Sequence, residues 1–382
     1  MQNLDSSSIK VQGHLAYRRN PIEFESPEEF GYERIRYNLA ESSVPDFVLG
    51  KLGLELDELV LRYIDHMGNP RLRSLIAGDS VSFEQVMVTT GAAGALFIVA
   101  TSLLRPSDHV VLLHPNYAAN LETPRAIGCP IDYLELSMEN QFRLEVAELE
   151  QLIKPSTRLV SLTYPQNPTG TLITDAELEE IVELVESHDC YLLLDETYRE
   201  MTPNKPLPIA ASLSENVISV SSFSKAYGLP GIRLGWLISQ NETLMYNFLA
   251  AKELIYICNS IVDEEIAAHF LSRKEEFLSG IQAHVKRNFG ILSNWMAKNP
   301  YMEWIKPTGG VIALPRIKSQ IYLDVEQFYE TLKMKYHTFV APGYWFELDR
   351  RFMRIGYGYP DNEQLAGGLN CITQAIEDSL QI

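Results

Sequence analysis

Two kinds of hydrophobic pattern alternate along the chain from about residue 46 to about residue 280. Short apolar runs rich in β-branched residues predict strands at 85–89, 109–113, 158–163, 190–194, 216–221 and 235–238. Stretches with helical spacing lie between them, at 92–104, 117–127 and 175–188, and Thr174 is placed to cap the last of these. Because the predicted strands are apolar on both faces, we expect an α/β fold with a mostly parallel sheet covered by helices.

The pattern changes after about residue 280. A long helical stretch at 281–298 is followed by short strands that alternate with turns, and then by a final helix. The first fifty residues are irregular and contain prolines, and we expect them to join the C-terminal segment. A chain of 382 residues exceeds one typical core. We therefore predict an N-terminal arm that forms part of the small domain (1–45), a large domain (46–280) and a small C-terminal α+β domain (281–382).

Composition and charge argue against several classes of function. Hydrophobic residues make up 46% of the chain, and the net charge of −18 would repel a phosphate backbone, so we expect no nucleic-acid partner. Glycines break the longest apolar stretch, 86–104, which is therefore not expected to span a membrane. The eight histidines lack metal-ligand spacing and the four cysteines lack disulfide spacing, so no metal is expected. The first twenty residues contain no apolar signal stretch, and we expect a cytoplasmic protein.

Polar or glycine-bearing loops follow nearly every predicted strand: TTGAAG, HPNY, YPQNPTG, DETY and SSFSK. In a parallel sheet, ligands bind beyond the carboxyl ends of the strands, where such loops meet. Three of these loops carry an amine, a carboxylate and an amide, namely Lys225, Asp195 and Asn167. Such a trio can hold pyridoxal 5'-phosphate, with the lysine as a Schiff base and the other two side chains tuning the ring.

The surroundings of Lys225 favour this chemistry over an ordinary solvated surface lysine. Ser222 and its neighbouring serines, together with Arg233 eight positions after the lysine, would supply ligands for a phosphate. Burial beside a cation would also lower the pKa of the Lys225 amine towards the working range. The glycine-bearing turn before the helix at 92–104 would present the backbone amides of Ala92 and Ala93 to the phosphate.

The other candidates each have an ordinary structural interpretation beside the chemical one. Asp195 could keep a pyridine nitrogen protonated, or it could cap the next helix. Asn167 and Tyr198 could donate to the phenolic oxygen of the ring, although Asn-Pro is also a turn former and a tyrosine there could be core. Tyr117 could stack on the ring or pack in the core.

The chain as a whole resembles the fold-type I, class I/II aminotransferases, which depend on pyridoxal phosphate. The stretches that carry the resemblance occur in the order and spacing of that family: RYIDHMGNPRLRSLIA, TTGAAGAL, HPNY, YPQNPTG, LLLDETY, SSFSKAYGLPGIRLGW, PTGG, APGYWF and FMRIGYG. The resemblance implies a sheet of the seven-stranded type in a large cofactor-binding domain. It also implies that Lys225 is the Schiff-base lysine and general base for moving an amino group between an L-amino acid and a 2-oxo acid.

The resemblance adds roles that spacing alone does not give. Arg354 resembles the arginine that grips the substrate α-carboxylate, and its planar fork suits that group. Tyr63 resembles the tyrosine that reaches the phosphate in a partner subunit, which implies a homodimer with shared active sites. A cofactor-sensing regulator with a DNA-binding module is not expected, because the match begins by about residue 30 and the charge is acidic.

One stretch departs from the common pattern of the family. In YNLAESSVPDF, Glu41 follows Ala40 where many aminotransferases have a neutral residue, and the stretch resembles the LAEN of aminocyclopropane carboxylate synthases. Within a substrate site, Glu41 could pair with a cationic substrate group or assist elimination. A lyase or cyclase on the same scaffold is therefore the alternative function, and an ordinary exposed acid is the plain interpretation of Glu41.

The sequence leaves the substrate side chain open. No arginine can be assigned to a distal carboxylate from spacing. The candidates for pocket walls are mostly aromatic and indicate a bulky or apolar amino acid: Tyr32, Tyr256, Asn259, Tyr344 and Trp345.

Overall fold

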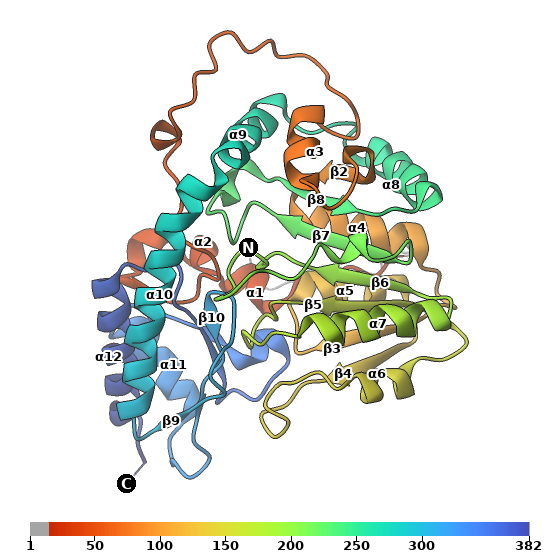
Figure 1. Cartoon of the computed structure of the whole chain (residues 1–382). Coiled ribbons are helices and arrows are strands. Elements are labelled where there is room, and N and C mark those ends of the chain that lie inside the picture. Colours follow the sequence, from red (N-terminus) through yellow and green to blue (C-terminus); the bar gives the residue numbers. More distant parts are fainter. Residues whose placement is uncertain (1–14, 382) are drawn as a thin grey trace.

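A seven-stranded sheet forms the centre of the larger part of the molecule (Figure 1). The computed structural model describes residues 15–381, so most of the N-terminal stretch inspected for a signal sequence lies outside the described residues. The strand order is β2-β8-β7-β6-β5-β3-β4. Strands β4, β3, β5, β6 and β7 run parallel, whereas β8 is antiparallel to both of its neighbours. The bounds are β2 Val86–Thr89, β3 His109–His114, β4 Ile131–Glu135, β5 Thr157–Thr163, β6 Tyr191–Asp195, β7 Val217–Ser222 and β8 Gly235–Ile238.

The six strands predicted from the sequence all form, each within one residue of its predicted ends. The seventh strand, β4, was not predicted, because only Leu134 within it is fully buried. It lacks the continuous apolar run that marks a strand covered on both faces, a run that β2 at the other edge of the sheet keeps. The predicted α/β fold with its mostly parallel sheet is confirmed.

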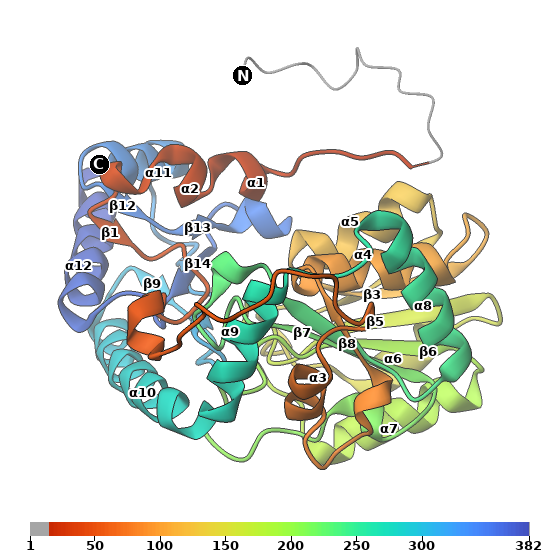
Figure 2. The same cartoon turned by 90° about the horizontal axis from the view of Figure 1, so that it is seen from above.

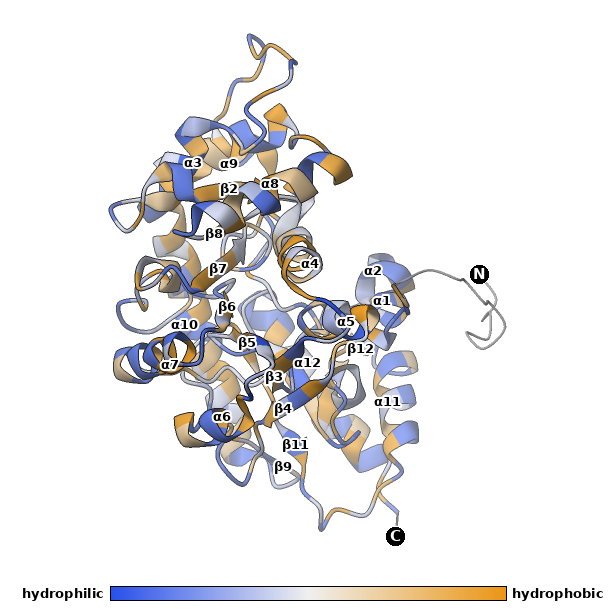
Figure 3. Ribbon diagram, turned by 90° about the vertical axis from the view of Figure 1, so that its right-hand side faces the viewer, coloured by the Kyte–Doolittle hydropathy of each residue, from blue (hydrophilic) through white to orange (hydrophobic). Residues whose placement is uncertain are grey.

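Helices cover both faces of this sheet, as successive residues of one strand show. Leu192 and Leu194 of β6 pack on the side of α6 (Val146–Leu152) and α7 (Asp175–Ser187), whereas Leu193 faces α4 (Gly91–Leu103), α5 (Ala118–Ile127) and α8 (Glu242–Ile255). Figure 3 shows α4 as hydrophobic around most of its surface, which fits its place between the sheet and the neighbouring helices. Thr174 caps α7 as predicted, since its hydroxyl accepts from the Glu177 amide at 3.1 Å.

The smaller part of the molecule is built mainly from the C-terminal segment. Its long helix α10 (Lys274–Lys298) follows α9 (Ile261–Ser272) and packs against α12 (Asn362–Asp378), which in turn contacts α11 (Val325–Met334). A small antiparallel sheet joins β10 (Ile312–Ala313), β14 (Met353–Gly356) and β13 (Ala341–Pro342). A second, two-stranded sheet joins β9 (Met302–Glu303) and β11 (Arg316–Ile317). Helix α3 (Pro70–Ala77) lies in the larger part and contacts α9.

The N-terminal segment packs on this smaller part, as the views in Figures 2 and 3 agree. Strand β1 (Tyr37–Asn38) pairs in parallel with β12 (Thr338–Phe339). Helices α1 (Pro21–Glu25) and α2 (Pro27–Phe30) precede it, and the ring of Phe30 lies 4.7 Å from that of Phe339. The Trp345 indole also donates to the Glu25 carboxylate at 2.8 Å. The division at 45/46 and 280/281 stays a proposal, and α10 runs across the second boundary.

A long loop between Leu52 and α3 projects away from both parts of the molecule (Figure 1). It carries three large exposed side chains, Val60, Leu61 and Tyr63, and Tyr63 is 79% exposed. Among residues 15–381, no helix is both long and apolar enough to cross a membrane. Over the same residues, no group of His, Cys, Asp and Glu side chains is arranged to hold a metal ion.

Candidate active site

A cavity of about 460 Å³ opens beyond the carboxyl ends of the parallel strands, where the sheet meets the smaller part of the molecule. Loops after β2, β3, β5, β6 and β7 contribute to its wall, together with the N-terminal segment and β14. Every site residue predicted from the sequence lines this cavity except Tyr63: Ala40, Glu41, Ala92, Ala93, Tyr117, Asn167, Asp195, Tyr198, Ser222, Lys225, Arg233 and Arg354. The fold therefore brings together residues from both ends of the chain and from the loops between them.

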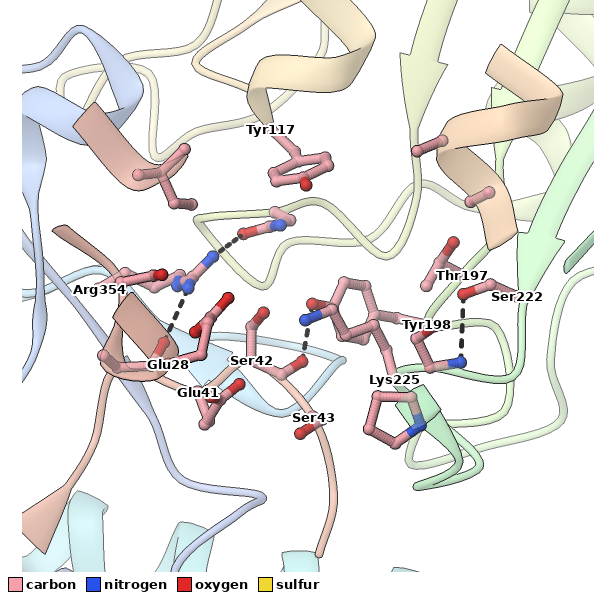
Figure 4. Close-up of a pocket in the computed structure, with 18 of the residues that line it drawn as sticks. Glu28, Glu41, Ser42, Ser43, Tyr117, Thr197, Tyr198, Ser222, Lys225 and Arg354 are labelled. Carbon is pink, nitrogen blue, oxygen red and sulfur yellow. Dashed lines mark hydrogen bonds between the residues drawn. The ribbon is translucent and has the colours of Figure 1, made fainter. Parts of the chain in front are cut away.

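Lys225 follows β7 by three residues and reaches into the middle of the cavity (Figure 4). Burial lowers the pKa of its amine, the nearby carboxylates of Glu41 and Glu28 oppose that shift, and the guanidinium groups of Arg354 and Arg233 add to it. The net direction is downward. An amine with a lowered pKa has a larger neutral fraction, and the neutral form is the one that attacks a carbonyl carbon.

Asp195 ends β6 and is buried, and three donors hold its carboxylate. Its Oδ1 accepts from the Thr197 amide at 3.0 Å and from the Thr197 hydroxyl at 2.6 Å, while its Oδ2 accepts from the Asn120 side chain at 3.3 Å. Burial raises the pKa of the Asp195 carboxyl, and these hydrogen bonds counteract the rise. No helix begins after β6 until Ala210, so the helix-capping interpretation of Asp195 is wrong. The carboxylate is left as a fixed acceptor at the floor of the cavity.

The amide of Asn167 is oriented by the substrate-side arginine. Its Oδ1 accepts a 3.0 Å hydrogen bond from Arg354 Nη1, so its Nδ2 is the end that remains to donate. Tyr198 is buried, and its hydroxyl donates to the Ser42 carbonyl at 2.8 Å, which ties the loop after β6 to the N-terminal segment. Burial raises the pKa of Tyr198 to about 12, so its hydroxyl keeps its proton at neutral pH.

Tyr117 lies on the opposite side of the cavity from Lys225 (Figure 4). It directly precedes α5, and burial raises the pKa of its hydroxyl to about 12. Its ring is therefore a neutral, flat surface at the cavity wall, which suits stacking on a planar heterocycle. The core interpretation does not account for its place in the cavity lining.

Backbone and side-chain donors gather at the N-terminus of α4. Ala92 and Ala93 lie in its first turn, and Arg233 reaches the same place with Nη1 donating to the Ser224 hydroxyl at 3.3 Å. A Cβ added to Gly91 would lie 3.0 Å from Arg233 Nη2, so only a glycine lets the guanidinium approach the turn so closely. Free amides at a helix N-terminus beside an arginine and serine hydroxyls form an anion-binding cup.

Arg354 is a buried cation with an unfilled donor. It lies on β14 and is only 3% exposed. Its Nη2 donates to the Ala40 carbonyl at 2.8 Å and its Nη1 to Asn167, but its Nε has no partner. Burial lowers the pKa of its guanidinium, which shows how little water solvates it. Because buried charges are normally compensated, this arrangement is prepared for an anion that the protein itself does not supply.

These features match the parts of pyridoxal phosphate one by one. The cavity offers an amine for its aldehyde, a buried carboxylate for its ring nitrogen, an amide donor for its phenolic oxygen, a flat aromatic wall for its ring and an anion cup for its phosphate. Arg354 matches no part of the cofactor and remains available to bind a second anion. The residues present therefore fit the cofactor.

Several cavity residues were not found by sequence reasoning. Thr197 and Glu28 line the cavity, and Asn120, outside the lining, holds the Asp195 carboxylate together with Thr197. Thr197 lies within DETY and could have been found as a local partner of Asp195, whereas Asn120 and Glu28 are identified only by the folded structure. Of the proposed pocket walls, Tyr32 and Trp345 line the cavity. The other three candidates are absent from its lining within one chain: Tyr256, Asn259 and Tyr344.

Tyr63 lies outside this cavity within one chain and stands on the projecting loop. Glu41, by contrast, is half-buried in the cavity lining, and its Oε1 accepts from the Tyr32 hydroxyl at 3.1 Å. The interpretation of Glu41 as an ordinary surface acid is therefore wrong.

Comparison with known proteins agrees with this geometry. The family described as aminotransferase class I and II matches residues 42–370. Capreomycidine synthase from Streptomyces vinaceus is 28% identical over 90% of this chain and 91% of that protein. An arginine–pyruvate transaminase from Pseudomonas aeruginosa is 28% identical over 67% of each chain. The crystal structure of a PLP-dependent aminotransferase from Streptococcus suis superposes with a TM-score of 0.88 at 27% identity, covering 96% of this chain and 99% of that one. The chain belongs to the class I and II aminotransferases, and it is a transaminase that depends on pyridoxal phosphate.

Proposed function

We propose that this cavity moves an amino group between an L-amino acid and a 2-oxo acid, with Lys225 as the covalent anchor of the cofactor and as the group that carries the proton. The observation that supports this most strongly is the union of Lys225, Asp195, the anion cup and Arg354 in one cavity. When bound, pyridoxal phosphate supplies an electron sink for the negative charge that develops at the substrate α-carbon.

The residues around Lys225 would hold and tune the cofactor. Asp195 keeps the ring nitrogen protonated, because a buried carboxylate is most easily compensated by a cation beside it. Asn167 would donate to the phenolic oxygen through Nδ2, and Tyr198 would do so once its hydroxyl turns away from the Ser42 carbonyl. Tyr117 would stack on the ring. The phosphate is held by the anion cup: Ala92, Ala93, Ser222 and Arg233.

Arg354 would hold the substrate by its α-carboxylate. The buried guanidinium offers Nε and one edge of its planar fork, and a carboxylate can accept from both. Fixing that carboxylate keeps the α-carbon in the cavity that Lys225 enters. When the substrate amine has replaced the Lys225 amine on the cofactor, the Lys225 amine would be free to remove the substrate α-proton. It would then deliver a proton to the cofactor carbon that bears the transferred amino group. Its lowered pKa increases the neutral fraction of the amine, which is the form that accepts a proton.

We propose that the enzyme works as a homodimer in which Tyr63 reaches the phosphate in the partner's cavity. Support comes from the loop that carries Tyr63, which also exposes Val60 and Leu61. Exposed apolar side chains in such a group are typical of interaction surfaces. A cytoplasmic location is also part of the proposal, and four free cysteines within the described residues suit a reducing compartment.

The cofactor's absorbance tests the proposal directly. Purified protein is incubated with pyridoxal phosphate and then with single amino acids, and conversion to the pyridoxamine form is recorded. Lys225→Ala should fold, lose the Schiff-base absorbance and retain no cofactor after borohydride reduction and denaturation. A Schiff-base spectrum that survives in Lys225→Ala would refute the assignment.

A lyase or cyclase is the second candidate, because Glu41 lies in the cavity close enough for its charge to act on Lys225. A relative named as a synthase, capreomycidine synthase, also matches nearly the whole chain. Ammonia or a ring-closed product without any pyridoxamine form would favour this function. Glu41→Gln should then abolish turnover, whereas a general transaminase would lose little with a neutral substrate.

A further inference from the structure

Four carboxylates besides Asp195 line the cavity. Glu23 and Glu28 come from α1 and α2, and Glu41 and Asp46 follow β1. Burial raises the pKa of the Glu23 carboxyl, and the charge of Glu28 adds to that rise. Burial likewise raises the pKa of Asp46, with a contribution from Glu41. The charges of Glu23 and Glu28 therefore act on each other, and so do those of Glu41 and Asp46.

No cation of the described residues pairs with these carboxylates. Within residues 15–381, none of the four forms an ion pair with a lysine, arginine or histidine. The side-chain partners that they do have are neutral hydroxyls. Tyr32 donates to Glu41 at 3.1 Å, and Tyr359 donates to Asp46 at 3.3 Å.

The cations that line the cavity are already assigned elsewhere. Arg233 lies at the anion cup, and Lys225, whose pKa is lowered by burial, is assigned to the cofactor. Arg354 is 3% exposed, its Nε has no hydrogen-bond partner, and Glu41 acts on it only through its charge, so Arg354 is assigned to the substrate carboxylate. A bound amino acid would satisfy Arg354 with its α-carboxylate. Arg19 acts on Glu23 and Lys225 acts on Asp46 only through their charges, so the four acids would still have no direct ion-pair contact among the described residues. A group of acids of this kind concentrates cations from solution.

We infer that the cavity selects an amino acid whose side chain ends in a cation, a guanidinium or an ammonium, and that Glu28 and Glu41 bind that end. The inference rests on the proposed transaminase function of the same cavity. In Figure 4, Glu28 and Glu41 lie on the Arg354 side of Lys225, away from Ser222 and the anion cup. Glu28 and Glu41 therefore lie on the substrate side of the cavity, whereas Asp195 is the acid assigned to the cofactor.

The aromatic walls are compatible with this assignment. The sequence indicated a bulky or apolar substrate because of its aromatic candidates, but of these only Tyr32 and Trp345 line the cavity. The Tyr32 hydroxyl is bound to Glu41, so this wall presents a carboxylate as well as a ring. Aromatic faces beside carboxylates favour guanidinium and ammonium groups over neutral chains.

Pairs of substrates with the same shape and different charge provide the test. The holoenzyme is assayed with L-arginine against L-citrulline, and with L-lysine against L-norleucine, by the yield of the pyridoxamine form and by kcat/KM. We expect the charged member of at least one pair to be favoured by about tenfold or more, the size of one hydrogen bond between charged groups. The two pairs also separate a guanidinium preference from an ammonium preference.

A binding measurement that needs no turnover accompanies the assay. 5-Guanidinopentanoate is arginine without its α-amino group, and 5-ureidopentanoate is its neutral counterpart. Calorimetric titration of the holoenzyme should show tighter binding of the guanidino compound. The ratio of the two dissociation constants should fall about tenfold in Glu41→Gln or Glu28→Gln. Glu29→Gln is the matched control, because Glu29 is an exposed neighbour on α2 outside the cavity lining.

The outcomes separate the two levels of the proposal. Equal kcat/KM within both pairs, or a charge preference that persists in the double variant Glu28→Gln, Glu41→Gln, overturns the substrate assignment and leaves the transaminase function standing. Absence of transfer from every amino acid overturns both.

Discussion

Arg354 and Asn167 are joined by a hydrogen bond of 3.0 Å, from Nη1 to Oδ1, although 187 positions separate them in the chain. The arginine comes from β14 in the smaller part, and the asparagine follows β5 of the central sheet. One contact thus links the proposed substrate carboxylate site to the proposed ligand of the cofactor's phenolic oxygen. It also fixes which end of the Asn167 amide is left to donate.

Arg354→Lys is expected to weaken substrate binding and to leave cofactor binding in place. A lysine keeps the charge but loses the planar fork, and it cannot hold both Asn167 and a carboxylate. We expect kcat/KM for amino acids to fall by about ten- to a hundredfold, the range of a lost charge-assisted hydrogen bond. Steady-state kinetics and the Schiff-base absorbance measure the two effects separately. Arg351→Lys is the control, since that arginine lies outside the cavity lining.

Asp195→Asn should retain the Schiff base but lose most of the turnover. The variant keeps the shape of the side chain and removes the negative charge that would keep the ring nitrogen protonated. Loss of one preorganised electrostatic partner typically costs about a hundredfold or more in kcat. Rapid mixing with a good substrate should show slow α-proton removal. A normal kcat in the Asp195→Asn variant would contradict the role given to this carboxylate.

Tyr63→Phe tests the shared active site. Size-exclusion chromatography with light scattering should give a dimer for both the wild type and the variant, because one hydroxyl is a small part of an interface. Cofactor affinity should fall about tenfold or more if the hydroxyl donates to a partner's phosphate. Tyr322→Phe is a matched control, since Tyr322 is 77% exposed and stands on the smaller part of the molecule. A monomer in solution would contradict the dimer proposal.

Glu196 should make the protein less stable as the pH rises. Burial raises the pKa of its carboxyl to about 7 in the folded state, above the ordinary value of 4.5. Because the pKa is raised, the folded protein holds this proton more tightly than the unfolded chain does. The contribution of Glu196 to stability is therefore fully present below about pH 4.5 and is lost as the pH rises to about 7.

Glu196→Gln should therefore be more stable than the wild type at pH 8, by about 3 kcal/mol from a shift of this size, and by much less at pH 5. Its amide oxygen can still accept from the Ala210 amide and the Ser219 hydroxyl, as the carboxylate does at 2.7 and 3.0 Å. Denaturant titrations at both pH values measure the difference. The exposed Glu215→Gln should show no such pH dependence.

Gly235→Ala tests how tightly β8 packs on the anion cup. A Cβ there would lie 2.5 Å from the Gly91 carbonyl carbon and 2.7 Å from the Ala92 nitrogen, which are backbone atoms that cannot turn aside. We expect a loss of about 1–3 kcal/mol in stability and weaker cofactor binding. Gly280→Ala on α10 meets nothing within 4 Å and should be neutral or slightly stabilising.

The sequence predicted the parts of this protein that depend on local pattern. Strands buried on both faces leave continuous apolar runs, so six of the seven central strands could be placed within a residue. The loops that follow these strands meet at one edge of a parallel sheet, so Lys225, Asp195 and Asn167 could be expected in one site. The resemblance to aminotransferases added Arg354, which no local pattern marks as buried.

Other features depend on contacts between distant segments. Strand β4 has a mixed burial pattern, so its sequence does not mark it as a strand. The sequence of residues 235–238 does not indicate that β8 runs antiparallel to its neighbours. Tyr256, Asn259 and Tyr344 do not line the cavity within one chain, because a side chain beside a motif gives no sign of the direction in which it points. Tyr63 could not be tested within one chain.

The amino-acid sequence by itself thus determined the fold class and the set of reactive groups, because periodicity and motif spacing act over a few residues. Only the tertiary structure decided the electrostatic character of the cavity. It brought α1, α2 and the segment after β1 against the catalytic loops, and so placed Glu23, Glu28, Glu41 and Asp46 together without an ion-pair partner among the described residues. Charge in a cavity is a sum over all the segments that surround it, and that sum is fixed only when the chain has folded.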